Sequence, residues 1–279
     1  MSFSAYRKIT QILVFVIMFL IPVLNLYEMY TVTGTFYAIN IGRLGIADPA
    51  VIMQAVFASG TLTVPLAGAA LFPLLAALLF GRIWCGWLCP YHLVADCAAW
   101  VRAKIRPKPA TDAPTALLPV PGSFRANMFR FGFLIVGTAA AGAIGVPLLN
   151  YVNAPGILST EAMILVKERT VSLEIAFIAS LVLLELTILP RFWCRLFCPT
   201  GAVISPVRTP YTLRVVNRME KLRKPCCPAV ACAEVCPMGL TPAIESTDLL
   251  CTNCGRCIDA CRACNGESRL RFRGFSGGR

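Results

Sequence analysis

Charged side chains are scarce in this sequence of 279 residues. Asp, Glu, Lys and Arg make up 14% of it, against roughly 25% in a typical soluble domain. Hydrophobic residues make up 57%, and the mean hydropathy is +0.69. This composition argues against an ordinary soluble protein, so we expect much of the chain to lie in lipid.

Histidine is almost absent, because His92 is the only one. A single histidine excludes the paired histidine ligands that hold b-type haems in membrane proteins, and the chain has no C-x-x-C-H motif for attached haem. It also has no phosphate-binding glycine loop, nucleophile triad or flavin motif. We therefore expect a haem-free protein.

Acidic residues are about half as common as basic ones, which gives a net charge of +12. In a soluble protein this excess of positive charge would suggest nucleic-acid binding, but here the positions of the basic residues along the chain indicate membrane topology instead. All but three of the 26 Lys and Arg residues lie before residue 9, between residues 82 and 130, or after residue 190; the exceptions are Arg43, Lys167 and Arg169. The positive-inside rule then places both termini in the cytoplasm of a bacterial inner membrane, with no nucleic acid as partner.

Four apolar runs are long enough to cross a bilayer, which takes about 20 helical residues. They are residues 9–26, 62–80, 131–149 and 171–189. Four crossings also agree with two cytoplasmic termini. Shorter apolar stretches follow Asp48-Pro49 and Ala154-Pro155; we expect them to lie along the outer surface, with Asp48 capping a helix that has Pro49 in its first turn.

The membrane part contains an internal repeat. Each half is expected to be a helical hairpin that ends in a C-x3-C-P motif, with repeat 1 at about residues 9–110 and repeat 2 at about 125–215. At an offset of 109 residues the first set of matching residues is Arg82, Trp84, Cys85, Cys89 and Pro90, and the second is Arg191, Trp193, Cys194, Cys198 and Pro199.

Cysteine is abundant, with 14 residues. In a reducing cytoplasm we expect thiolate ligands and not disulfides. The strongest motif is C-x2-C-x2-C-x3-C, the spacing of bacterial ferredoxins, in which the fourth cysteine reaches a second 4Fe-4S cluster. It comprises Cys251, Cys254, Cys257 and Cys261. The first three, together with Cys236, are the expected ligands of one cluster. Zinc is the alternative, since four thiolates also suit Zn²⁺.

The other ferredoxin motif is irregular. Cys232-x3-Cys236-Pro237 fits the end of the pattern, but Ala229 stands where a cysteine belongs. The second cluster is expected on Cys232 and Cys261 with Cys226, Cys227 or both, and with Cys264 as a replacement ligand. A 3Fe-4S cluster or an empty site is the alternative.

The C-x3-C-P motifs pair Cys85 with Cys89 and Cys194 with Cys198. Residues four apart on a helix share a face, so each pair could chelate, and the prolines would end the helices there. Duplication predicts that the pairs meet as one four-thiolate site for a metal or a further iron-sulfur centre. The alternative is a set of buried apolar cysteines, which is also our interpretation of Cys97.

Two titratable residues are candidates for proton transfer. His92 closely follows Cys89, although it could be an ordinary interfacial residue. Glu185 lies in an apolar run, where carboxylates are often functional. It could accept a proton from a quinol, or it could pair with Arg82 or Arg191; both interpretations remain open.

With these motifs the sequence resembles the NapH/MauN family of membrane quinol dehydrogenase components, from about residue 7 to residue 261. The resemblance implies oxidation of quinol from the membrane pool and delivery of electrons to iron-sulfur, cytochrome or reductase subunits. The chain departs from the family pattern at Ala229 and at Arg262, where a proline usually follows the last ferredoxin cysteine.

We therefore expect an all-α membrane protein with four transmembrane helices, arranged as two duplicated hairpins in residues 1–215. A ferredoxin-like double-cluster domain would follow in residues 216–265, and a flexible basic tail in 266–279. The expected function is electron transfer from quinol to a partner. The alternatives are a CcoG-like copper reductase, with Cu(I) on the boundary thiolates, and a non-enzymatic anchor or redox sensor for a soluble oxidoreductase.

Overall fold

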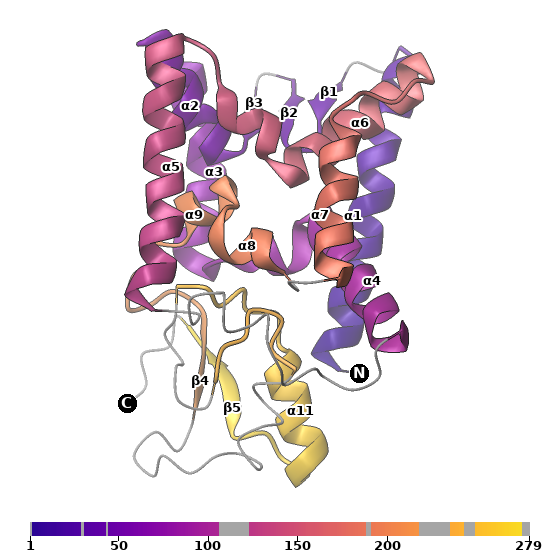
Figure 1. Cartoon of the computed structure of the whole chain (residues 1–279), viewed down its shortest axis with the longest axis vertical. Helices are drawn as coiled ribbons and strands as arrows, with labels where there is room; N and C mark the ends of the chain where they lie inside the picture. Colours follow the sequence, from indigo (N-terminus) through magenta and orange to yellow (C-terminus); the bar gives the residue numbers. More distant parts are fainter. Residues whose placement is uncertain are drawn as a thin grey trace.

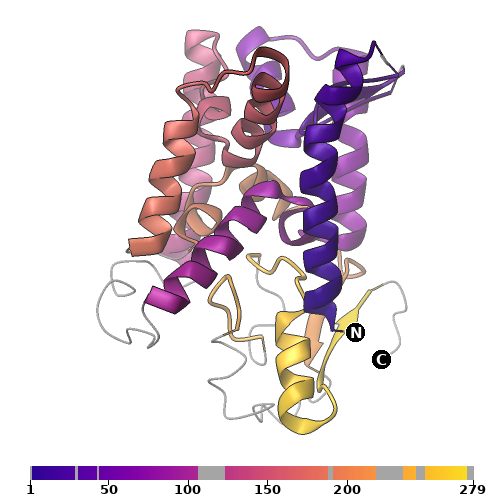
Figure 2. The ribbon, with the colours of Figure 1, turned by 90° about the vertical axis from the view of Figure 1, so that its right-hand side faces the viewer.

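The apolar part of the chain is built from upright helices, and a cysteine-rich part lies at one end of them (Figure 1). The structure is a computed structural model that describes residues 2–28, 31–42, 44–105, 123–187, 191–217, 235–242 and 249–274. The first residues of α1 (Phe3–Leu26) lie beside the cysteine-bearing helix α11 (Arg256–Asn265), as Figure 2 shows.

The helices follow the same order in both halves of the chain. A long helix is followed by a short helix, an apolar helix, a helical turn and a helix that begins with proline. The first half has α1, α2 (Pro49–Ser59), α3 (Val64–Phe80), the π-helical turn η1 (Trp84–Leu88) and α4 (Pro90–Ile105). The second has α5 (Phe124–Ile144), the 3₁₀ turn η3 (Leu148–Val152), α6 (Ala154–Glu168), α7 (Ile175–Thr187), α8 (Phe192–Leu196) and α9 (Pro199–Ile204).

Each half packs on the other through its short helix. Helix α2 contacts α5 and α9, while α6 contacts α1 and α4. The N-cap residues of these two helices also meet, since Asn153 Nδ2 donates to Asp48 Oδ2 at 3.0 Å. Asp48 accepts the backbone N–H of Ala50 at 2.9 Å, with Pro49 in the first turn, so the expected cap is present.

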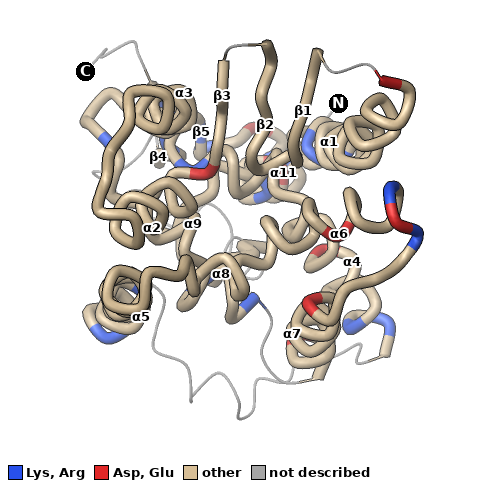
Figure 3. The backbone as a smooth tube through the Cα atoms, turned by 90° about the horizontal axis from the view of Figure 1, so that it is seen from above, with Lys and Arg blue, Asp and Glu red and all other residues tan. Residues whose placement is uncertain are grey.

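Helix length supports two membrane crossings. By length and composition, α1 with 24 residues and α5 with 21 residues can span a bilayer. Each expected span overlaps a helix, but α3 has 17 residues, and α7 has 13 up to the edge of the described segment. Helices α2 and α3 carry no charged residue (Figure 3). The four-crossing topology therefore stays a prediction.

Helix α5 lies earlier in the chain than the apolar run 131–149 predicts. It begins after Ser123, whose side chain caps the N–H of Ala126. It ends at Gly145, whose φ of 76° is left-handed, as is common where a helix stops. The last apolar residues of the run belong to η3, because hydrophobicity alone does not show where the backbone turns.

The expectation of an all-α fold is wrong at the end of the bundle opposite the cysteine-rich part (Figure 1). Strands β1 (Val32–Thr35), β2 (Ala38–Ile41) and β3 (Leu44–Ala47) form an antiparallel sheet in that order, with Thr35 opposite Ala38 and Ile41 opposite Leu44. These registers are those of two-residue hairpin turns. Strand β3 packs against α3, so the sheet covers one side of the first half.

The expectation of a flexible tail from residue 266 does not hold for residues 270–273. Strand β5 (Leu270–Arg273) pairs antiparallel with β4 (Arg214–Asn217), with Arg214 opposite Arg273. Val215 and Leu270 are buried between this pair and α11. The boundaries expected at 215 and 265 therefore separate residues that form one small unit, since β4 crosses the first boundary and β5 lies beyond the second.

The cysteine-rich unit is fixed to α1 by a carboxylate. Asp259 of α11 accepts the backbone N–H of Phe3 at 3.0 Å, and the N–H and hydroxyl of Ser4 at 2.7 Å each. A negative charge at the start of a helix is favourable, because the first amides of a helix have no partner within it. This contact orients α11 against the helical bundle.

Gly255 provides a test of this docking. Its φ is +75°, and an added Cβ would lie 2.7 Å from Phe3 Cβ, whereas Gly266 has the same φ and open space. Gly266→Ala should cost about 1 kcal/mol for the left-handed backbone alone. Gly255→Ala should cost more because α1 must also move, and thermal unfolding of the two variants would measure the difference. Equal losses would contradict the contact.

Candidate metal centres and the polar network between them

Four cysteines line one pocket in the C-terminal unit. They are Cys236, Cys251, Cys254 and Cys257, the four that the ferredoxin spacing assigns to one cluster. Val215, Met238 and Leu240 complete the wall, so the sulfur atoms face an apolar space. Burial raises the pKa of Cys251 to about 12. A metal bound there would have to displace the thiol proton.

The second set of expected ligands is only partly described. Cys261 is fully buried, and its sulfur accepts the backbone N–H of Arg269 at 3.4 Å. Cys261 and Cys264 are disulfide-bonded in the structure, and cluster binding would need the reduced thiolate instead. Cys226, Cys227 and Cys232 lie outside the described residues, so their ligation stays a prediction.

The loop that carries Cys251 and Cys254 is fixed to the first repeat. Asn253, at a left-handed φ of 50°, donates from Nδ2 to the carbonyls of Phe80 and Leu213 at 3.0 and 2.7 Å. Trp87 of η1 donates to the Asn253 carbonyl at 3.0 Å. At Gly86 any Cβ would come within 2.5 Å of the Thr252 carbonyl, so only glycine permits this approach.

The C-x3-C-P cysteines do not share one helical face as expected. Cys85 lies in η1, but Cys89 is extended, with φ −77° and ψ 118°. In the second repeat Cys194 lies in α8 and Cys198 is extended, with φ −61° and ψ 113°. The residue before a proline is pushed out of the helical region, so the prolines begin the next helices and do not end the previous ones.

These four cysteines nevertheless gather at one place. Cys89 and Cys198 are buried in one hydrophobic cluster, and Cys194 packs against it. Cys198 lies close enough to Cys85 and Cys89 to interact with both electrostatically, as does Cys194 with Cys89. Among the described residues, no three His, Cys, Asp or Glu side chains are placed to hold a single metal ion.

The two cysteine groups meet across one small apolar cluster. Met238, Leu240 and Leu250 are buried together, with Met238 and Leu250 1% exposed. Against this cluster pack Cys194 of the membrane repeats and Cys236 and Cys251 of the ferredoxin unit. Cysteines of both candidate centres therefore contact the same apolar cluster.

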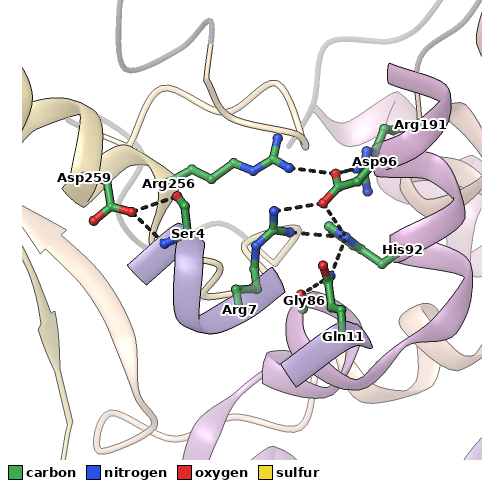
Figure 4. A network of polar contacts seen from close by, with 9 residues as sticks. All are labelled: Ser4, Arg7, Gln11, Gly86, His92, Asp96, Arg191, Arg256 and Asp259. Atoms are coloured by element: carbon green, nitrogen blue, oxygen red, sulfur yellow. Dashed lines mark hydrogen bonds and ion pairs between the residues drawn. The ribbon is translucent and has the colours of Figure 1, made fainter. Parts of the chain in front are cut away.

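A network of polar side chains is centred on Asp96 of α4 and is drawn in Figure 4. Its carboxylate binds Arg7 of α1 at 2.8 Å, Arg256 of α11 at 2.7 Å, and Arg191, which precedes α8. Arg7 and Arg191 are buried, whereas the Arg256 side chain is 27% exposed. One carboxylate thus joins the first helix, both repeats and the ferredoxin unit.

The network carries more positive than negative charge. Burial lowers the pKa of Arg191 to about 10, which leaves it protonated at neutral pH. Arg7 and Arg191 both interact electrostatically with Cys254, and Arg191 also with Cys194. Three buried or half-buried arginines against one carboxylate leave positive charge beside both cysteine groups.

His92 belongs to this network and is held neutral. Burial, and then the charges of Arg191, Arg7 and Arg256, lower its pKa well below the usual value. Its Nδ1 accepts from Gln11 Nε2 at 3.2 Å and from Arg7 Nη1 at 3.4 Å, which places the ring proton on Nε2. Nε2 is buried without a partner in the described part of the chain. The proton-transfer role suggested for His92 stays a prediction.

Glu185 does not pair with either arginine considered for it. Its Oε1 accepts the hydroxyl of Tyr91 at 2.9 Å, and the ion pair of Arg191 goes to Asp96. Arg82 donates to the Leu249 carbonyl at 3.2 Å. Glu185 is 3% exposed and faces the bundle interior, so its proposed exchange with quinol remains a hypothesis.

Sequence reasoning missed Asp96 and the role of Arg7. Arg7 was counted only among the basic residues that indicate membrane topology, although its side chain is fully buried. A signal for Asp96 exists in retrospect, since it is the one acidic residue of α4 and lies four residues after His92. Such spacing places both side chains on one helical face.

Comparison with protein families bears on the membrane cysteines. A family model described as a 4Fe-4S binding domain matches residues 61–109 and 171–208. Each matched segment contains one C-x3-C-P motif, and the ferredoxin cysteines lie outside both. The chain is therefore of the iron-sulfur class.

Curated relatives identify the family. The chain is 30% identical over 249 residues to the methylamine utilization ferredoxin-type protein MauN of Methylorubrum extorquens, covering 86% of this chain and 77% of the relative. The ferredoxin-type protein NapH of Haemophilus influenzae is 27% identical over 208 residues, which are 70% of this chain and 65% of that protein. The Escherichia coli NapH is 24% identical over 227 residues, 77% and 72% of the two chains.

The chain belongs to the NapH/MauN family of ferredoxin-type proteins, as its motifs suggested. It spans slightly less than two thirds of the Haemophilus influenzae relative. No solved structure gives a significant match to the chain.

Asp96 can be tested by charge removal. Asp96→Asn should cost about 3–5 kcal/mol, because it leaves buried arginines without their counter-charge. Replacing the partly exposed Arg256 by Gln in the same protein should restore part of that loss. Glu168→Gln, at the exposed end of α6, is the control. Thermal unfolding measures all three, and an unchanged melting temperature for Asp96→Asn would contradict the central role of Asp96.

Proposed function

We propose that this protein is a membrane electron-transfer subunit that takes electrons from quinol and passes them to a redox partner. Iron-sulfur centres on the two cysteine groups would carry the electrons. The observation that supports it best is the shared cluster of Met238, Leu240 and Leu250, against which cysteines of both groups pack. Centres separated by a single layer of side chains are placed for electron exchange.

The residues present fit iron-sulfur clusters. Cys236, Cys251, Cys254 and Cys257 would hold one cluster, since they line one pocket in the ferredoxin spacing. Cys85, Cys89, Cys194 and Cys198 would hold a further centre, consistent with the family model that covers them. When bound, such clusters supply one-electron transfer at a potential set by charge, hydrogen bonds and exposure.

The protein's own side chains prepare these sites. Apolar residues such as Met238 and Leu250 keep water away from the sulfur atoms. Arg7, Arg191 and Arg256 place positive charge beside thiolates that become negative on ligation. Positive charge favours the reduced state of a cluster, because reduction adds negative charge. The Asp96 network would therefore raise the reduction potential of the neighbouring centres.

The orientation of the chain is part of this proposal. With four crossings formed by α1, α3, α5 and α7, the ferredoxin unit lies in the cytoplasm, and the sheet β1–β3 lies on the outer side. The distribution of Lys and Arg supports this arrangement, because only Arg43, Lys167 and Arg169 fall in the outer segments. Subunits with haem or iron-sulfur centres are the proposed partners.

The proposed function is tested by isolating the protein without oxygen. Iron and sulfide analysis with paramagnetic resonance should show clusters, and a quinol analogue should reduce them. Cys254→Ser should remove the ferredoxin signal, and Cys194→Ser should stop its reduction by quinol. Cys97 is exposed, so its interpretation as a buried apolar cysteine was wrong; it lies outside both groups, and Cys97→Ser should change neither result. Iron-free protein, or clusters that no quinol reduces, would refute the function; copper in place of iron would support the copper alternative.

Topology has its own test in reporter fusions. Alkaline phosphatase is active only outside the cytoplasm, so a fusion after Asn150 should be active and one after Ile105 should be inactive. A fusion after Gly274 should also be inactive. Activity of the Gly274 fusion would place the ferredoxin unit on the outer side and contradict the proposed orientation.

A further inference from the structure

An apolar cavity of about 230 Å³ lies between the sheet β1–β3, α3, η1 and α9, whose arrangement Figure 1 shows. From α3, one helical face contributes Phe72, Pro73, Ala76, Ala77 and Phe80. Phe72 and Phe80 are exposed, so the cavity reaches the lipid-facing side of α3. An apolar cavity of about 150 Å³ holds benzene in a protein core, so this one has room for a ring with several substituents.

Aromatic rings form the inner wall. Phe36 and Trp84 lie nearly parallel, with centroids 6.1 Å apart and planes 23° apart. Tyr37 meets Trp84 edge-on, at 6.3 Å and 83°. A flat ligand can pack against such a wall by stacking or edge-on contact.

Three polar side chains also line the cavity, and two of them, Tyr37 and Asp48, can still bond a ligand; the third is Thr200. Tyr37 is 5% exposed; in the described residues its buried hydroxyl has no nitrogen or oxygen partner and lies beside the Cys89 thiol. Asp48 is 6% exposed and accepts from Ala50, Asn153 and Thr200. A carboxylate has about four acceptor positions, so one remains for a ligand. Buried polar atoms left open beside an apolar space indicate a ligand with polar atoms of its own.

Residues next to the C-x3-C-P cysteines line the cavity. Trp84 and Leu88 line it and directly precede Cys85 and Cys89. Tyr37 also lies close enough to Cys89 to interact with it. Thr200, at the other side, follows Cys198 by two residues. A ring in this space would lie next to the candidate centre of the two repeats.

We infer that this cavity binds the ring of a membrane quinone or quinol, with Tyr37 and Asp48 as hydrogen-bonding partners of its oxygens and the isoprenoid tail leaving past Phe72 and Phe80. The inference rests on the proposed function and gives it a location. A quinol hydroxyl donates to Asp48, and the Tyr37 hydroxyl donates to a quinone carbonyl. A lipid acyl chain has the apolar character but no atoms to meet these two groups.

A second cavity gives Asp48 a connection to the outer surface. It has about 320 Å³ and is lined by Asn150, Asn153, Thr160 and Glu174. Tyr37 lines both cavities, and Asn153 bonds Asp48 from the outer one. The polar end of the quinone site therefore lies next to a polar space, while its apolar end faces lipid.

Binding of a decyl-substituted benzoquinone or naphthoquinone tests the site, on cluster-loaded protein in lipid nanodiscs, by quenching of tryptophan fluorescence. Ala76→Phe fills the cavity and should abolish saturable binding. Ala67→Phe is the matched control, because residue 67 lies nine positions away on the opposite, exposed face of α3 and lines neither cavity. It should bind as the unaltered protein does.

Tyr37→Phe is a second variant, in which only one hydroxyl group is removed. It removes a hydroxyl that has no nitrogen or oxygen partner in the described structure and only the weakly accepting Cys89 thiol beside it, so the melting temperature of ligand-free protein should change little. Quinone affinity should drop about five- to tenfold, the effect of one hydrogen bond. A purely structural tyrosine would show the reverse, with lower stability and unchanged affinity, and that result would overturn the inference.

The same variants separate this inference from the proposed function. If quinol reduces the clusters of the unaltered protein and of Ala76→Phe equally well, quinol binds elsewhere and the inference fails while the function stands. If no quinol reduces the clusters of the unaltered protein, the function itself fails. Displacement of the probe by a saturated fatty acid, together with unchanged affinity in Tyr37→Phe, would identify a lipid pocket instead.

Discussion

The carboxylate of Asp96 holds together parts of the chain that would otherwise repel one another. Arg7, Arg191 and Arg256 come from the first helix, the second repeat and the ferredoxin unit, and each is bound to this one acid. Buried arginines without a counter-charge are costly, so the three segments are stable together only around Asp96. The same arrangement leaves positive charge next to two groups of thiols that become negative when they bind metal. The charge that makes the fold depend on Asp96 thus also makes the site suited to anionic clusters.

The two repeats share one arrangement of helices, but the side chains that differ between them make different contacts. Corresponding helices pack in corresponding ways, with α2 on α5 and α6 on α1. Residues at equivalent positions nevertheless have different partners. Asp48 and Asn153 both stand at the N-cap of a short helix and bond to each other, yet only Asp48 lines the apolar cavity. Arg82 bonds a carbonyl of the ferredoxin loop, while its counterpart Arg191 bonds Asp96. One repeat therefore offers a cavity for a ring, and the other joins the charge network.

The sequence was most informative where spacing alone decides the chemistry. The C-x2-C-x2-C motif, together with Cys236 of the second motif, predicted which four cysteines would share a pocket, and Asp48-Pro49 predicted a helix cap. It was misleading where a local rule overrides a pattern, because the proline after Cys89 forces that residue out of the helix that the spacing implied. The strands β1–β3 were missed among longer apolar runs, and β5 was read as a tail because its basic residues hid the alternation of Leu270 and Phe272. Asp96 and Tyr37 gain their importance from neighbours distant in sequence, which no local pattern contains.

The bond between Asp259 and the first turn of α1 has a consequence for assembly. It joins residues 256 positions apart, so the first helix to be synthesised completes its amide bonding only when the last helix arrives. Contacts of such long range form late, because the intervening chain must first be ordered. Until then the backbone amides of Phe3 and Ser4 lack their carboxylate partner. The ferredoxin unit therefore docks on α1 through Asp259 only after both of these helices have been synthesised.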